Sequence, residues 1–104
     1  GDEVPHKKPA PDIFRAALQK IGSDARACIA FEDSSNGLRA AVGAGLATVV
    51  TPTFWTEGSD FATARLVLPH LGDPWQPLPD EPGRRLRDTA WVTLAELQRL
   101  VEAR

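Results

Sequence analysis

The 104-residue sequence is poor in several features, and each shortage excludes a class of protein. It has one cysteine, Cys28, which excludes a disulfide framework and favours a reducing compartment. No apolar run approaches the roughly 18 residues that a membrane span needs. The formal net charge of -2 creates no positive field. We therefore expect neither a nucleic acid nor a membrane as a partner.

Methionine is absent altogether, and the first eight residues contain no apolar signal region. We expect a cytoplasmic protein, or one of the plastid stroma if the source is a photosynthetic eukaryote. Because no methionine begins the sequence, we also expect that the chain was cut from something longer. A processed or tagged start is the alternative.

Helical and strand patterns alternate along the first half of the chain. Pro11 and Gly22 bound a helix predicted over about 12–21. Apolar runs at 28–31 and 46–50 have the length of buried strands, and a helix over about 35–44 is predicted between them. This order predicts an α/β fold with a short parallel sheet. The predicted buried face of the first helix consists of Ile13, Phe14, Ala17, Leu18 and Ile21.

The second half gives weaker signals until its end. We expect a short helix over 59–64, an edge strand over 65–68, and a surface loop over 69–82, which holds five prolines. Trp55, Trp75 and Trp91 are expected to anchor loops rather than to bind a ligand.

A capping box of Thr93 and Glu96 predicts a C-terminal helix. Its predicted buried stripe consists of Leu94, Leu97, Leu100 and Val101. We thus divide the chain into a core segment at 1–70, a proline-rich loop at 71–90, and a helix at 91–104 that packs on the core.

Two adjacent carboxylates, Glu32 and Asp33, directly follow the first predicted strand. In open α/β sheets, ligands bind beyond the carboxyl ends of the strands. A pair of carboxylates at such a place forms the hard oxygen site that Mg²⁺ favours. The alternative is that one carboxylate caps the next helix and the other is solvated. The pair alone does not decide between these readings.

Lys8, at the head of the first helix, carries a compact charge that neutralises a phosphate oxygen or a carboxylate. Taken alone, Lys8 is more readily interpreted as an exposed lysine in a charged tail, beside Lys7 and His6. If it belongs to a site, its ammonium and the Asp33 carboxylate should open on the same edge of the sheet, within about 10 Å.

The residues after the carboxylate pair are of the kind that starts helices. Ser34 and Asn36 are weak candidates for contacts with a substrate or anion, and capping is the favoured role. Cys28 is expected to be a small core residue rather than a reactive thiol.

Taken together, Lys8-Pro-Ala-Pro-Asp-Ile-Phe and Phe31-Glu-Asp-Ser-Ser-Asn-Gly resemble the third and fourth motifs of the haloacid dehalogenase superfamily. The form of the motifs is that of its phosphatase and β-phosphoglucomutase branch, and the lysine precedes the acidic pair by the family's spacing of about 24 residues. The resemblance covers roughly residues 1–70. Within the branch, the segments 1–8, 49–52 and 67–72 look most like CbbY-type sugar-bisphosphate phosphatases.

The resemblance implies a partial Rossmann-like, three-layer core and a Mg²⁺-dependent phosphatase. Its substrate would be a small phosphorylated sugar of the xylulose 1,5-bisphosphate type, and it would act through an aspartyl-phosphate. Lys8 would stabilise the charge shared by the nucleophile and the phosphoryl group, and Glu32 and Asp33 would ligate Mg²⁺.

The chain departs from the family pattern in what it lacks. The Asp-x-Asp-Gly-Thr motif that carries the nucleophile, the second-motif Ser/Thr and the substrate-selecting cap domain are all missing. Family members carry all three before the lysine. We therefore expect the C-terminal part of a core domain, inactive alone and completed by a missing N-terminal half. The alternatives are a truncated, non-catalytic α/β module that binds a partner, and a phosphosugar mutase of the same branch.

Overall fold

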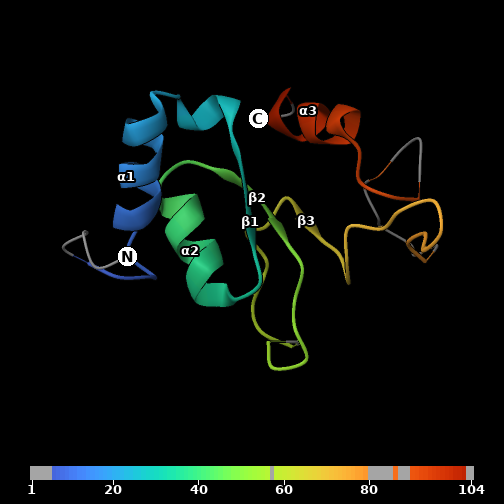
Figure 1. Ribbon diagram of the computed structural model, residues 1–104. Helices are drawn as coiled ribbons and strands as arrows, with labels where there is room; N and C mark the ends of the chain where they lie inside the picture. The colour runs from blue at the N-terminus through green and yellow to red at the C-terminus, as the bar shows by residue number, and fades with distance from the viewer. Residues whose placement is uncertain (1–5, 57, 80–85, 87–89, 103–104) are drawn as a thin grey trace.

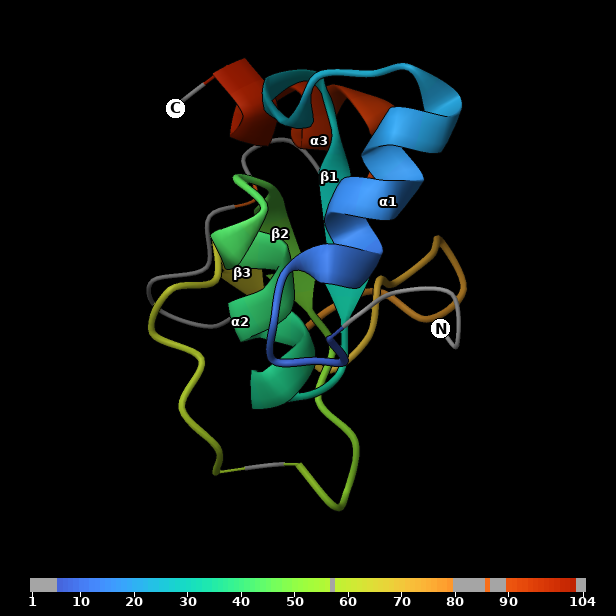
Figure 2. The ribbon, with the colours of Figure 1, turned by 90° about the vertical axis from the view of Figure 1, so that its left-hand side faces the viewer.

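The computed structural model describes residues 6–56, 58–79, 86 and 90–102. Helices α1 (Asp12–Ile21) and α2 (Ser35–Gly43) cover one face of a small sheet, and α3 (Leu94–Glu102) lies on the other side (Figure 1). The view turned by 90° in Figure 2 places α1 and α2 in front of the strands and α3 behind them. The predicted α/β fold with a C-terminal helix is confirmed.

The sheet consists of β1 (Ile29–Glu32), β2 (Ala47–Val50) and β3 (Leu66–Val67), in the order β1-β2-β3 and with both pairs parallel. A single turn of 3-10 helix, η1 (Ala25–Ala27), leads from α1 into β1. All four residues of β2 are buried, as a central strand covered on both faces requires.

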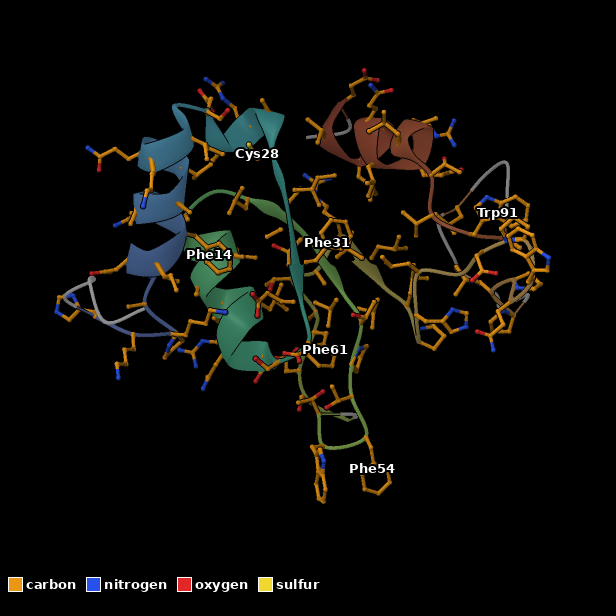
Figure 3. All side chains as sticks on the ribbon, viewed as in Figure 1. Phe14, Cys28, Phe31, Phe54, Phe61 and Trp91 are labelled. Atoms are coloured by element: carbon orange, nitrogen blue, oxygen red, sulfur yellow. The ribbon has the colours of Figure 1, made fainter. Side chains whose placement is uncertain are left out.

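Alternation along β1 distributes its side chains between two apolar clusters. Ile29 packs against a cluster formed by Val49, Leu66, Leu68 and Leu78, to which α3 contributes Leu97 and Leu100. Ala30 belongs to the cluster on the α1 and α2 side. Because successive strand residues point to opposite faces, Phe31 follows Ile29 and Glu32 follows Ala30. The end of β1 therefore directs the Glu32 side chain toward α1 and α2, and Figure 3 shows Phe14 on that side and Phe31 on the other.

The predicted helix over 59–64 is wrong, because this segment forms turns. The Asp60 carboxylate accepts a hydrogen bond from the Ala62 N–H (3.0 Å), and the Ala64 N–H donates to the Phe61 carbonyl (3.0 Å). Such local bonds from aspartate compete with a helical ladder. The predicted edge strand after it is present but has only two residues.

Several apolar residues expected inside lie at the surface. Ile21 is 67% exposed and Leu94 is 71% exposed, because each lies at an end of its helix. Trp55 and Trp75 are 88% and 89% exposed, so they do not anchor their loops by burial.

Helix α3 begins as the capping pattern predicts, with the Glu96 N–H donating to the Thr93 hydroxyl (3.2 Å). The Glu96 carboxylate is buried and pairs with Arg99. No helix among the described residues is both long and apolar enough to cross a membrane.

Candidate active site

The candidate site lies where β1 ends and α2 begins. Glu32 is the last residue of β1, and its carbonyl accepts a hydrogen bond from the Thr51 N–H, directly after β2 (2.9 Å). Its side chain is only 11% exposed. A carboxylate this far out of water needs compensating charge or donors.

Lys8 supplies that compensation. Its Nζ lies 3.0 Å from Glu32 Oε2 and 5.2 Å from the centre of the Phe14 ring, on α1. The ammonium is thus held between an acceptor and an aromatic face, both of which favour a cation. The peptide bond that joins Lys8 to Pro9 is cis. Because of its contacts with Glu32 and Phe14, Lys8 does not lie in a solvated tail, although its catalytic role stays a prediction.

Gly37, in the first turn of α2, makes room for the other carboxylate oxygen. A Cβ atom at this position would lie 1.7 Å from Glu32 Oε1. The Gly37 N–H donates to the hydroxyl of Ser34, the N-cap residue of α2 (3.1 Å). The Glu32 carboxylate therefore lies against the positive end of the α2 dipole, which stabilises negative charge. A glycine inside a helix, where alanine is more stable by about 1 kcal/mol, was the sequence signal for this contact.

We expect Gly37→Ala to lower the free energy of unfolding by about 1–3 kcal/mol, because the new methyl group overpacks against Glu32. In a Glu32→Ala background the obstacle is gone, and the same Gly37→Ala change should stabilise the helix by about 1 kcal/mol. Urea unfolding of the four proteins in this cycle, each measured with the core completed by its N-terminal half, gives both signs. Destabilisation in both backgrounds would show that Glu32 does not fill the space above Gly37.

Asp33 differs from Glu32 in its surroundings. It is exposed, and among the described residues none forms a hydrogen bond or an ion pair with its carboxylate. Its backbone carbonyl, however, accepts a short hydrogen bond from the Thr56 hydroxyl (2.6 Å). The two acidic residues are therefore not equivalent: Glu32 is the partner of Lys8, and Asp33 presents a carboxylate that is open to a ligand.

The remaining candidates take structural positions. Ser34 caps α2, as favoured from the sequence, and Asn36 is exposed in the first turn of that helix. Cys28 is half-buried and packs against the cluster on the α1 and α2 side. His6 is largely exposed and lies 3.0 Å from the Asp12 carboxylate.

Within the described residues, no three His, Cys, Asp or Glu side chains gather in a way that could hold a metal ion. Glu32 and Asp33 do supply two carboxylates at one strand end, which is the usual protein contribution to a Mg²⁺ site that also binds phosphate and water. The donor set thus fits Mg²⁺ only as part of a larger site.

Comparisons with known proteins agree with this geometry. A family model described as haloacid dehalogenase-like hydrolase matches residues 1–45. The plasmid-encoded protein CbbY of Cupriavidus necator is 53% identical over 93 residues, which cover 88% of this chain and 35% of the relative.

Two crystal structures of CbbY from Rhodobacter sphaeroides also match, each with 49% identity and a TM-score of 0.65. One is in complex with phosphate, and the other is a mutant in complex with xylulose-(1,5)bisphosphate. The match covers 66% of this chain and 31% of the solved one, so the chain spans about a third of the length of these relatives. The chain belongs to the haloacid dehalogenase-like hydrolases, with CbbY proteins as its relatives.

Proposed function

We propose that this chain forms the lysine and acidic-pair part of a Mg²⁺-dependent phosphatase that acts on a small phosphorylated sugar. One observation carries the proposal. The Lys8 ammonium is fixed 3.0 Å from Glu32 at the strand end where the exposed Asp33 follows, so a cation and an open carboxylate share one edge of the sheet. The structure of a relative with xylulose-(1,5)bisphosphate supports a sugar bisphosphate as the substrate class.

Each residue has a role in this proposal. Asp33 is the main Mg²⁺ ligand, because its carboxylate is exposed, and Glu32 is the second ligand while it also orients Lys8. Bound Mg²⁺ would offset the negative charge of the phosphoryl group. Lys8 stabilises the charge that develops between that group and an aspartyl nucleophile supplied from outside this chain. Ser34 and Asn36 contribute at most weak contacts to the substrate.

A phosphosugar mutase of the same branch and a non-catalytic α/β module remain the alternatives. The division of the chain into segments that end at residues 70 and 90 also stays a prediction. So does the location of the protein in the cytoplasm or the plastid stroma. The mutase would use the same lysine and carboxylates, and its product would be an isomeric sugar phosphate instead of inorganic phosphate. The module would need no open carboxylate beside a fixed lysine.

The test is a chimera in which this chain replaces the matching segment of the C. necator CbbY protein. We expect Mg²⁺-dependent release of inorganic phosphate from xylulose 1,5-bisphosphate, because the chimera then holds both halves of the site. Asp33→Asn should abolish the release, since the amide carries no charge to hold the cation.

Unaltered C. necator CbbY is the positive control for the assay. Asp24→Asn is the matched control, because it makes the same change at an exposed aspartate before the start of β1, at the opposite end of the strand, and it should retain most of the activity. A folded chimera that releases no phosphate, or one whose turnover survives Asp33→Asn, would contradict the proposed function.

A further inference from the structure

A threonine from a distant loop is bonded to the backbone of the acidic pair. Thr56 lies in the segment that follows β2, 23 residues after Asp33, and its hydroxyl contacts the Asp33 carbonyl at 2.6 Å. The Thr56 hydroxyl oxygen, Oγ1, also lies 2.8 Å from the backbone nitrogen of Thr53 and 3.1 Å from the Thr53 hydroxyl oxygen. Thr56, a half-buried residue, thus joins two loops at the carboxyl edge of the sheet through its hydroxyl.

The distances fix the direction of these hydrogen bonds. A threonine hydroxyl has one proton, and the Asp33 carbonyl is a much closer acceptor for it than the Thr53 carbonyl, at 3.4 Å. With that proton committed, Thr56 Oγ1 accepts from both the N–H and the hydroxyl of Thr53. A donor chain results, running from Thr53 through Thr56 to Asp33, and such chains strengthen each member.

The bond restrains the residue that carries the open carboxylate. The carbonyl of Glu32 is already held by Thr51, and that of Asp33 is held by Thr56, so two successive peptide planes are tied to the chain after β2. On the other side, Ser34 is fixed as the N-cap of α2. Asp33 therefore has a restrained backbone beneath an exposed side chain.

The loop that follows β2 and contains Thr53 and Thr56 is not held in place by packing at its tip. Phe54 and Trp55 are 82% and 88% exposed, and their rings contact each other with centroids 5.3 Å apart. Figure 3 shows Phe54 at the far end of this loop, beyond the strands. The Thr56 hydroxyl, rather than burial of these aromatic rings, ties the loop to the site.

We infer that Thr56 is a positioning residue for the Asp33 carboxylate, holding its backbone so that the side chain is pre-oriented for a divalent cation. This inference rests on the proposed function, in which Asp33 is the main Mg²⁺ ligand. Groups that orient metal ligands without touching the metal typically contribute ten- to a hundredfold to affinity, by order of magnitude.

The test uses the chimera with this chain and the substitution Thr56→Val, which keeps the shape and removes the hydroxyl. We expect about a tenfold higher Mg²⁺ concentration for half-maximal activity, with kcat at saturating Mg²⁺ nearly unchanged. Binding of Mn²⁺ without substrate, followed by electron paramagnetic resonance, should weaken by the same factor. Thr56→Ser keeps the donor and should restore both values.

A third measurement depends on neither metal nor turnover. The ¹⁵N order parameter of the Ser34 amide reports on the peptide plane whose carbonyl Thr56 holds, and it should fall from the rigid value of about 0.85 in Thr56→Val. The matched control is Thr48→Val, which removes a buried hydroxyl that bonds to the Leu46 carbonyl, away from the acidic pair. It should leave the metal dependence unchanged.

The two proposals fail in different ways. If the unsubstituted chimera is folded but hydrolyses nothing, the proposed function fails. If it is active and Thr56→Val matches it in Mg²⁺ dependence, Mn²⁺ affinity and Ser34 order, the inference about Thr56 is overturned. Loss of kcat alone, not rescued by Thr56→Ser, would also overturn it.

Discussion

Replacing Lys8 by methionine in the chimera is expected to lower kcat by about 10²–10³-fold, the usual cost of removing one group that stabilises transition-state charge. The physical reason is the position of the ammonium. It is held by Glu32 and by the ring of Phe14 at the strand end, and 36% of the side chain remains exposed. Methionine keeps the length of the side chain and its contact with Phe14 but removes the charge. Phosphate release under saturating Mg²⁺ measures the effect.

Lys8→Met also leaves the Glu32 carboxylate without its ion-pair partner, so a loss of activity has two possible causes. The double variant Lys8→Met/Glu32→Gln separates them when it is compared with Glu32→Gln alone. Neutral glutamine no longer needs a cation beside it, and the single variant accounts for the charge lost from the proposed second Mg²⁺ ligand. We expect the double variant to recover most of the lost stability in urea unfolding and none of the lost turnover. A double variant that is as stable and turns over as fast as Glu32→Gln alone would assign Lys8 a structural role only.

Much of the fold follows from local sequence patterns. Pro11 and Gly22 bound α1 where predicted, and the apolar runs became β1 and β2 within a residue of their expected bounds. These elements were predictable because apolar spacing and turn residues agree. The turns at 59–64 were not predictable. A polar capping residue and a segment of helical length do not show whether the Asp60 carboxylate will bond to a nearby backbone N–H, which prevents the helix.

The site was only partly predictable for a different reason. The sequence predicted that Glu32 and Asp33 lie together at the end of a strand, because they are adjacent and follow its last apolar residue. It did not show that they face different surroundings, because that depends on the pleat of β1 and on Lys8 approaching from the α1 side. Gly37 and Thr56 were missed as site residues. The contact of Gly37 with Glu32 depends on how the strand meets the helix, and that of Thr56 joins segments 23 residues apart. A lone glycine or threonine in the sequence carries only a weak signal of such contacts.

Strand β1 lies at one end of the strand order in the sheet. Among the described residues, β1 pairs only with β2, so its other edge is open. Beside it lies a groove of about 340 Å³ between β1 and α3, and Phe31, in its lining, is 45% exposed. The other lining residues are Ala27, Ile29, Leu94, Leu97, Gln98, Val101 and Glu102. The family resemblance implies that the strand bearing the nucleophile occupies this edge.

In the isolated chain an open strand edge with apolar surroundings invites pairing with another copy. Leaving a few hundred Å² of apolar surface uncovered forgoes several kcal/mol at about 25 cal/mol per Å². A whole domain is stable by only about 5–15 kcal/mol. We therefore expect the isolated chain to be marginally folded and to self-associate through β1. We also expect no Mg²⁺-dependent hydrolysis, because the chain contains no Asp-x-Asp-Gly-Thr nucleophile motif.

Sedimentation velocity over a range of concentrations measures the association, and Phe31→Lys should shift the chain toward monomer by placing a charge in the groove. Val42→Lys is the control, since Val42 lies at the surface of α2, with a similar exposed fraction of 38%, away from the edge.

Adding the N-terminal part of a CbbY protein in trans should reduce self-association, and turnover should appear only in that mixture. A monomeric chain with a sharp cooperative melt would refute the stability claim. Hydrolysis by the purified chain alone, lost on Asp33→Ala, would refute the claim of inactivity.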